Sequence, residues 1–139
     1  MWKIIMLAAG LLSLLSACAT QQASLDTNPA YTSHRYSSHE LAINWKSAKT
    51  ADGLSVEGTV TNVRPDLPYN SLELKARLLG ENGDVLGKKE HVFPNRFIGS
   101  EPFRMDFPLE QNQVPSRIKF TYSYGTVEDH FLKEFESAP

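Results

Sequence analysis

The side chain with the most distinctive chemistry in this sequence is the thiol of Cys18, the only cysteine among 139 residues. A thiol is a nucleophile that can accept another group covalently, and its thiolate is the reactive form. A disulfide within the chain is excluded because Cys18 has no second cysteine to pair with. Cys18 directly follows two small residues, Ser16 and Ala17, at the end of an apolar run. The surroundings of this thiol therefore decide what chemistry we expect from it.

The residues before Cys18 have the order of an export signal. Lys3 supplies a positive charge, and an uncharged run follows over 4–15. That run is shorter than the ~20 apolar residues that a membrane-spanning helix needs. It also lacks the polar face of a helix that packs on a soluble core. A charged start, an apolar middle and small residues before a cut are typical of a secretory signal.

The tetrapeptide LSAC at 15–18 resembles the bacterial lipobox, in which the cysteine thiol receives a diacylglycerol and a peptidase then cuts before it. The resemblance implies that 1–17 is a lipoprotein signal peptide and that Cys18 is the lipid attachment residue. Its acyl chains would anchor the mature protein to a membrane that it does not span. By resemblance to the sorting rule of enteric bacteria, Asp directly after the acylated cysteine keeps a lipoprotein in the inner membrane. Ala19 occupies that position here, which favours the outer membrane, with the domain facing the periplasm. An ordinary signal peptide that leaves Cys18 as a free thiol is the alternative.

The other groups with catalytic or metal-binding potential do not form a recognised site. The four histidines are His34, His39, His91 and His130. None has the i, i+4 partner or the cysteine pairing of a zinc site, and no Gly-x-Ser-x-Gly nucleophile motif is present. His34 and His39 can form a two-histidine surface site, but solvated histidines are the favoured interpretation. We therefore expect no enzyme, no bound cofactor and no metal.

The strongest candidate for an interaction surface is the segment from Phe93 to Ile98. Phe93, Arg96 and Phe97 are of the types that are enriched in binding hot spots. The favoured interpretation of this segment is structural, with Phe93 and Ile98 plugging the open end of the sandwich. A second candidate is the polar strand expected over 84–92, which would lie at a sheet edge and could pair with a strand of a partner.

Composition restricts the class of protein. Without the leader, 122 residues remain, which suffice for one domain with one core. The leader contains one lysine and no acid, so its removal changes the formal net charge from −2 to −3. A weakly acidic domain of mixed charge is no candidate for general nucleic-acid binding. The polar, aperiodic segment after the leader predicts that 18–38 is an acylated cysteine and flexible tether, with the folded domain at 39–139.

From Glu40 onward, short runs of alternating apolar and polar residues predict half-buried strands. The alternating runs cover 41–45, 54–62, 72–78, 103–109 and 118–124. A short polar strand is expected over 84–92, and 127–135 makes a last strand, whose end can instead form a short helical turn. About seven strands at this spacing predict an all-β fold, a single immunoglobulin-like antiparallel β-sandwich. Asn82-Gly83 predicts a tight type I′ hairpin turn, because both residues tolerate positive φ.

The stretch 56–87 resembles the opening of small bacterial immunoglobulin-like domains of the FxLYD type. The matching positions are Gly58, Val60, Asn62, Asn82, Gly83 and Val85. The Tyr-Asp that names the family is replaced here by Leu79-Gly80, and the usual Pro-Gly of a later turn by Ile98-Gly99. The resemblance implies the fold and little about function, because these domains occur in exported and membrane-bound proteins of mostly unknown task.

Two positions in this stretch have a structural interpretation that does not depend on the resemblance. Gly58 in mid-strand predicts the close approach of a bulky neighbour, such as Trp45. Asn62 at a strand end predicts hydrogen bonds to backbone groups of the following loop.

Taken as a whole, the sequence predicts a lipid-anchored module of the bacterial cell envelope. We expect it to be a non-catalytic protein interaction or assembly module with an unidentified protein partner in the envelope, and not to bind nucleic acid. The alternative is a small-ligand or metal carrier that uses the region of His34 and His39 or a pocket between the sheets.

Overall fold

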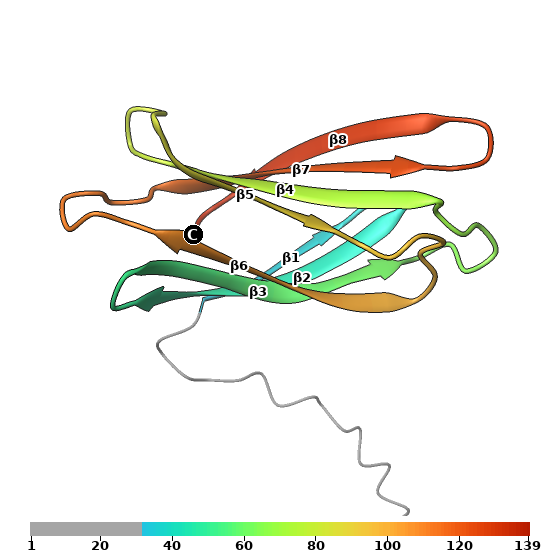
Figure 1. The fold of residues 1–139 in the computed structure, drawn as a ribbon, viewed down its shortest axis with the longest axis horizontal. Helices are drawn as coiled ribbons and strands as arrows, with labels where there is room; N and C mark the ends of the chain where they lie inside the picture. Colours follow the sequence, from blue (N-terminus) through green and yellow to red (C-terminus); the bar gives the residue numbers. More distant parts are fainter. Residues whose placement is uncertain (1–31) are drawn as a thin grey trace, which may run out of the picture.

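The computed structural model describes residues 32–139, which form eight β-strands and no helix (Figure 1). The strands are β1 (Thr32–Ser37), β2 (Leu41–Thr50), β3 (Gly53–Asn62), β4 (Ser71–Leu79), β5 (Val85–Val92), β6 (Ser100–Pro108), β7 (Arg117–Gly125) and β8 (His130–Ser137). The predicted signal peptide, Cys18 and the segment up to residue 31 lie outside the described residues.

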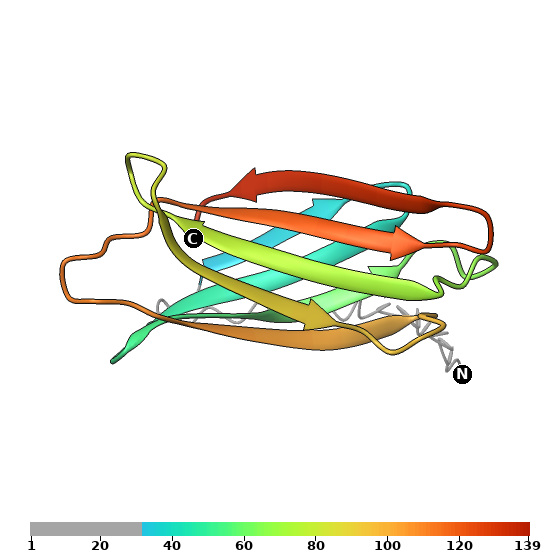
Figure 2. The same cartoon turned by 45° about the horizontal axis from the view of Figure 1, so that its top comes forward.

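The strands form two four-stranded sheets that pack face to face (Figures 1 and 2). One sheet has the order β1-β2-β3-β6 and the other β5-β4-β7-β8, and every pairing is antiparallel. The connections β3–β4, β5–β6 and β6–β7 cross from one sheet to the other. The predicted all-β antiparallel sandwich is confirmed.

The strand order is that of an immunoglobulin-like domain with one addition. β2, β3 and β6 take the places of strands A, B and E, and β5, β4, β7 and β8 take those of C′, C, F and G. Strand D is missing, because β5 leads directly to β6. β1 lies beside β2 as an extra edge strand, and it accounts for eight strands where the sequence predicted about seven.

β1 corrects the sequence interpretation, which placed these residues in the tether and started the domain at residue 39. It pairs with β2, with His34 opposite Trp45 and Tyr36 opposite Ile43. Its sequence, TSHRYS, is polar, and its core-facing positions carry a histidine and a tyrosine instead of aliphatic residues. The apolar alternation that reveals the other strands is therefore absent, although β1 belongs to the sandwich.

The core lies between the sheets and is built mainly from alternate residues of β2, β3, β4, β6 and β7, together with loop aromatics. The largest fully buried side chains are Tyr69, Tyr122, Phe107, Phe120, Leu41, Ile43, Leu72, Leu74, Leu78 and Ile118. β5 lies at a sheet edge as predicted, and its Lys88 and Lys89 are exposed. Such charges discourage edge-to-edge pairing.

Both local predictions in β3 are confirmed. A Cβ on Gly58 would lie 2.8 Å from both Cα and Cβ of Trp45 and would collide with the carbonyl oxygen of Asn44. The Asn62 side chain donates to the carbonyl oxygens of Leu67 at 2.9 Å and Phe97 at 3.2 Å. It also accepts from the backbone N–H of Arg64 at 2.7 Å, so one amide fixes the start of the β3–β4 loop and the loop beside it.

The β4–β5 turn differs from the predicted type I′ form. The N–H of Gly83 donates to the carbonyl of Gly80 at 3.0 Å, and Gly83 has φ 82° while Asn82 does not have a positive φ. This is the longer hairpin connection in which one left-handed residue follows an ordinary turn. The register shift between Leu78 and Leu79 accompanies it.

Candidate functional site

Four loops meet at one end of the sandwich, which we call the four-loop end (right-hand side of Figure 1). They are residues 38–40, 63–70, 93–99 and 126–129. Backbone hydrogen bonds join them: Asn62 N–H donates to Gly99 at 2.8 Å, and Asn70 N–H to Gly125 at 2.8 Å. β1 begins, and the C-terminus lies, at the opposite end, which we call the terminal end (Figures 1 and 2).

Of the three residues predicted as an interaction surface, only Arg96 lies on the surface. Phe93 and Phe97 are 3% and 2% exposed, and their rings pack edge to face with centroids 5.3 Å apart. The backbone of Phe97 donates to Tyr69 at 2.7 Å and accepts from it at 3.2 Å, which holds the loop against the core. The structure therefore places both phenylalanines in the core. Phe93 closes the end as the structural interpretation expected, but Ile98 is 50% exposed and does not.

The chain turns sharply at Arg96, which has a left-handed backbone with φ 63°. This conformation is uncommon for residues other than glycine, asparagine and aspartate. It reverses the loop, so that Phe97 enters the core while the Arg96 side chain remains exposed.

Four exposed aliphatic side chains lie in loops or at a strand end at the four-loop end. They are Val63, Val92, Ile98 and Val127, of which Val127 is 88% exposed. Val63 is held beside the β1–β2 turn, because its N–H donates to the carbonyl of Glu40 at 3.2 Å. Exposed arginines, Arg64 and Arg96, come from the same loops. Exposed apolar side chains accompanied by arginine are typical of protein contact sites.

A polar cleft of about 420 Å³ opens where the β1–β2 turn meets β7 and β8. Its lining residues are Tyr36, Ser37, Ser38, His39, Glu40, Tyr122 and Lys133. The Tyr122 hydroxyl donates to Ser38 Oγ at 3.2 Å and lies 3.3 Å from the Tyr36 hydroxyl. Ser38 Oγ accepts from the N–H of Glu40 and of Leu41, so this serine organises the turn.

The protonation states in this cleft follow from burial and hydrogen bonding. Burial raises the pKa of Glu40, but hydrogen bonds from Ser38 and the backbone and the charge of Lys133 outweigh it, leaving that pKa below its ordinary value. Burial and the nearby Glu40 carboxylate raise the pKa of Tyr124 to about 12. Burial also raises the pKa of Tyr122. The cleft therefore holds the Glu40 carboxylate and the neutral Tyr122 phenol at neutral pH, with the Lys133 side chain in its lining.

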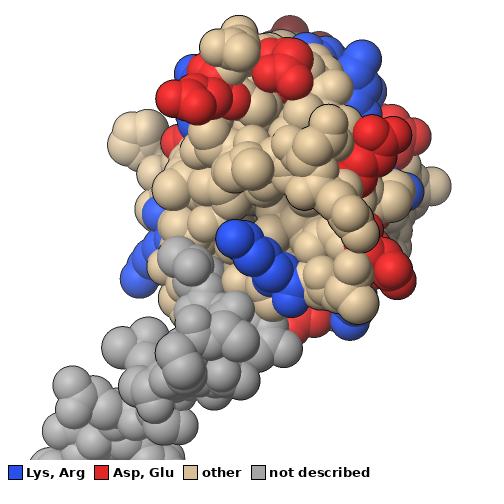
Figure 3. All heavy atoms as spheres, turned by 90° about the vertical axis from the view of Figure 1, so that its left-hand side faces the viewer, with Lys and Arg blue, Asp and Glu red and all other residues tan. Residues whose placement is uncertain are grey.

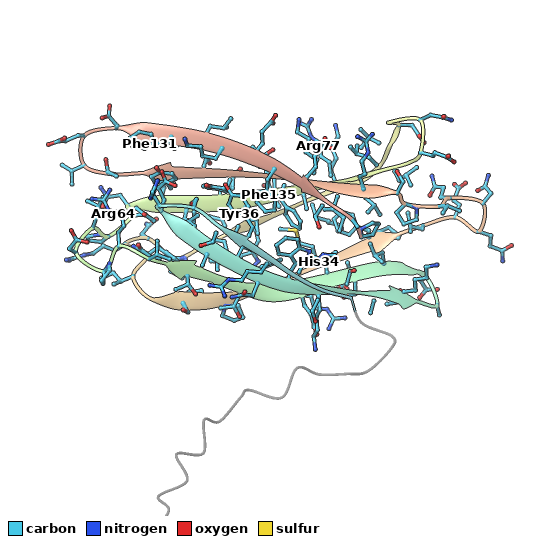
Figure 4. All side chains as sticks on the ribbon, turned by 180° about the vertical axis from the view of Figure 1, so that it is seen from behind. His34, Tyr36, Arg64, Arg77, Phe131 and Phe135 are labelled. Atoms are coloured by element: carbon cyan, nitrogen blue, oxygen red, sulfur yellow. The ribbon has the colours of Figure 1, made fainter. Side chains whose placement is uncertain are left out.

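β1 and β8 are joined by aromatic contacts along the side of the sandwich. The rings of Tyr36 and Phe135 stack with centroids 3.8 Å apart, and Figure 4 shows them lying together. His34 stacks on Trp45 at 5.2 Å, and its Nδ1 lies 3.3 Å from Ser137 Oγ. β1 is thus fixed to the opposite sheet as well as to β2.

The structure does not bring His34 and His39 into an evident metal site. The half-buried His34 faces the core, whereas His39 is exposed on the turn and lines the polar cleft. Within residues 32–139, no group of three or more metal-ligating side chains comes together. His34 Nε2 and Trp45 Nε1 are buried without a hydrogen-bond partner among the described residues.

The largest cavity described on the molecule is a groove of about 950 Å³ across the outer face of the β1-β2-β3-β6 sheet. Its walls are two rows of outward-facing residues, each row crossing all four strands. One row consists of Ser33, Lys46, Glu57 and Arg104, and the other of Arg35, Asn44, Thr59 and Pro102. The row between them, His34, Trp45, Gly58 and Phe103, turns inward, so its backbone forms the floor. His91 of β5 completes the lining beside β6.

Charges on the groove walls are unevenly paired. Glu57 lies 3.3 Å from Lys46 Nζ and 3.6 Å from Arg104 Nη1, and Arg104 also contacts Asp106 at 3.1 Å. Arg35 makes no ion pair with any residue of 32–139. Among the described residues, the walls contain three basic side chains and one acidic side chain.

Comparison with known proteins assigns no relative. No protein-family model matches this chain, no curated protein matches it significantly, and no solved structure does so. The resemblances to the lipobox and to FxLYD-type domains therefore remain predictions. In the part of the chain from residue 32 on, there is no helix with the length and apolar character needed to cross a bilayer.

Sequence reasoning missed both the aliphatic surface and the groove. Val63, Ile98 and Val127 are single apolar residues in three separate loops, and only the fold brings them to one end. The groove depends on the register of four strands, one of which is the unpredicted β1. The outward-facing polar positions of these strands are ordinary in sequence, so they give no signal of a shared depression.

Proposed function

We propose that this protein is a non-catalytic interaction or assembly module of the bacterial cell envelope. An acylated Cys18 anchors it to a membrane, and by the sorting resemblance this is the outer membrane, with the domain facing the periplasm. The support comes from the charged, apolar and small-residue order before Cys18 and from the β-sandwich that begins at Thr32.

The position of β1 supports one orientation of an anchored domain. The 13 residues 19–31 separate Cys18 from Thr32, so they reach at most about 45 Å when fully extended. They enter the sandwich at the terminal end. Figure 3 shows this end, where residues that are neither acidic nor basic occupy much of the centre and most charged groups lie toward the rim. The terminal end would thus face the membrane, and the four-loop end would face away from it.

The observation that carries the proposal is the aliphatic surface at the four-loop end. Val63, Ile98 and Val127 are exposed there, on loops that are fixed to one another by backbone hydrogen bonds. Apolar side chains held on a fixed frame lose little conformational entropy when a partner covers them. The proposed mechanism is recognition of a protein partner by these loops, without covalent chemistry.

The test is cross-linking in native membranes followed by identification of the cross-linked species. The variant Ile98→Ser/Val127→Ser should lose the partner recovered with the unmodified protein. A matched control, Val85→Ser/Val114→Ser, changes two exposed valines at the terminal end and should retain the partner. Equal cross-linking by both variants would rule out the four-loop end as the contact site.

The anchor is tested separately by mass spectrometry of the protein purified from membranes. We expect the mature chain to begin at Cys18 and to carry the mass of acyl chains, and the Cys18→Ser variant to appear in the soluble fraction. An unmodified Cys18 in the membrane-purified protein would contradict the anchored role without bearing on the contact surface.

The polar cleft favours a second candidate function, binding of a small ligand or a metal. Its Glu40 carboxylate, Lys133 ammonium group and His39 ring line one space of about 420 Å³. Titration with zinc and copper, followed by the ring signals of His39 and His34, tests the metal alternative. Stoichiometric binding that shifts His39 and is lost in His39→Gln would favour this carrier function.

A further inference from the structure

Lysine and arginine side chains on the outer face of the β5-β4-β7-β8 sheet fall into two groups. Lys75, Arg117 and Lys119 each lie within 4.0 Å of a glutamate on the same face. Arg77 and Lys88 are exposed and make no ion pair with any residue of 32–139. The second group therefore presents two positive charges that no carboxylate of the described chain neutralises.

The strand register places these two cations next to each other and beside a third. Arg77 of β4 lies directly opposite Lys88 of β5 and, on its other side, directly opposite Lys119 of β7. Figure 4 shows Arg77 on the outer side of the sheet. Directly opposite side chains on one face have Cβ atoms about 5 Å apart, and like charges there destabilise a sheet. An anion bound among Lys88, Arg77 and Lys119 would offset this repulsion.

The carboxylates nearest to this row on the same face have partners elsewhere. Glu136 of β8 ends the row, and its side chain contacts Arg117 at 3.2 Å. Glu90 is the next outward-facing residue of β5, and it lies 4.0 Å from Lys75 Nζ. Neither carboxylate forms an ion pair with Arg77. The row therefore keeps an excess of positive charge.

The side-chain types in the row favour one class of anion. A guanidinium group presents a fixed fork of N–H donors that matches two oxygens of a phosphate, and an ammonium group adds a compact charge. A phosphate monoester has three strong acceptor oxygens and a charge close to −2 at pH 7. A carboxylate has only two oxygens, which the fork alone would occupy. Long side chains from β5 and β7, which are about 10 Å apart, can converge over the middle strand.

We propose that the outer face of β4 and β5 binds a phosphate group, with Arg77 as the bidentate donor and Lys88 as the second cation. Lys119, which also contacts Glu134 at 2.9 Å, is the third. The site lies toward the terminal end, because Arg77 is close to the end of β4 and the β4–β5 turn lies there (Figure 1). Two sources of the group fit this position, a lipid headgroup and a free phosphate or phosphate ester. The headgroup source rests on the anchored orientation proposed above, whereas phosphate binding itself does not.

The test uses the isotope-labelled chain 18–139, which contains all eight strands, titrated with sodium phosphate at pH 7. Sodium chloride keeps the ionic strength constant, so that changes in general screening do not contribute. We expect saturable shifts of the amide signals of Arg77, Lys88 and Lys119. The Tm should rise with phosphate concentration, because a ligand that binds only the folded state stabilises it.

Charge variants test the row itself. Arg77→Gln and Lys88→Gln should each weaken phosphate binding by about three- to tenfold. Lys88→Glu should abolish binding and raise the Tm without phosphate, because it places a carboxylate directly opposite Arg77. Arg35→Gln is the matched control, since it changes another exposed arginine with no ion pair among residues 32–139, which faces Asn44 across the strands. It should leave the phosphate affinity unchanged, and all these side chains are exposed, so every variant is expected to fold.

Vesicles distinguish the two sources of the phosphate group. Sedimentation compares vesicles of phosphatidylcholine alone with vesicles that also contain phosphatidic acid, whose headgroup is a phosphate monoester. Binding to phosphatidic acid that is lost in Lys88→Glu and kept in Arg35→Gln assigns the site to a lipid headgroup. Saturable phosphate binding without vesicle binding assigns it to a free phosphate or phosphate ester.

Two results overturn the proposal. The first is the absence of both saturable phosphate binding and vesicle binding that depends on Lys88. The second is equal phosphate affinity of Lys88→Glu and Arg35→Gln, which would mean that the row does not hold the anion. Neither result bears on the anchor or on the four-loop end, which are tested by the mass of Cys18 and by cross-linking.

Discussion

Replacement of Gly58 by alanine tests the close approach of β2 and β3 that shapes both the core and the groove floor. An added Cβ would lie 2.8 Å from Cα and Cβ of Trp45 and would collide with the Asn44 carbonyl oxygen. All three of these atoms belong to the backbone or are directly attached to it, so rotation of a side chain cannot relieve the clash. Overpacking of this kind costs about 1–3 kcal/mol, and the backbone contacts place Gly58→Ala at the upper end, about 2–3 kcal/mol.

For a domain of this size, that loss corresponds to a fall in Tm of about 10–20 °C. Urea unfolding followed by tryptophan emission measures it directly, because Trp45 is the only tryptophan once the leader with Trp2 is absent. Thr59→Ala is the matched control, since it changes the adjacent, outward-facing residue of β3. It should alter stability by less than about 0.5 kcal/mol.

The refuting result is a Gly58→Ala protein within about 0.5 kcal/mol of the unmodified chain. A second refutation is rescue by a smaller ring: if Gly58→Ala/Trp45→Phe were more stable than Trp45→Phe alone, the indole and not the backbone would be the obstacle. We expect the two changes to remain close to additive, because the clash involves atoms that Trp45→Phe does not remove.

Three further changes probe the loops and the cleft. Asn62→Ala removes two donated and one accepted hydrogen bond to backbone groups. It should lower the free energy of unfolding, measured in urea, by about 2–3 kcal/mol. A decrease below about 0.5 kcal/mol would contradict the role of Asn62 in fixing the loops. In a double-mutant cycle, Tyr36→Ala and Phe135→Ala should show a coupling energy of about 0.5–1.5 kcal/mol, because their rings stack. If the two changes in unfolding free energy were additive, the stacking of these rings would not join the sheets. The pKa of Tyr124 is raised to about 12 in the folded state, so the folded protein retains a proton that the unfolded chain loses near pH 10. Stability should therefore be complete below pH 10 and fall as the pH rises toward 12; Tyr124→Phe should flatten this fall, and an unchanged profile would show that another group is responsible.

The sequence was sufficient to predict most of the sandwich, because five of its strands, β2, β3, β4, β6 and β7, follow an alternating pattern that burial on one face requires. β1 escaped prediction because its contacts with the core are aromatic stacks made by His34 and Tyr36. A histidine and a tyrosine spaced by two in a polar segment do not distinguish a strand from a tether. The partners of these stacks, Trp45 and Phe135, lie in β2 and in the last strand, so the signal for β1 exists only in the folded chain.

For a related reason, the sequence left the 93–98 segment open between a contact surface and a structural plug. Aromatic residues in a loop suggest a binding surface when the direction of each side chain is unknown. Here the left-handed backbone at Arg96 turns Phe97 inward, and no local preference of arginine predicts that conformation. Burial of both phenylalanines leaves the aliphatic residues of neighbouring loops as the exposed apolar groups. The core therefore contains the aromatic side chains that are best suited to recognition. Contact specificity at the four-loop end then depends on how the loops position the smaller, aliphatic side chains.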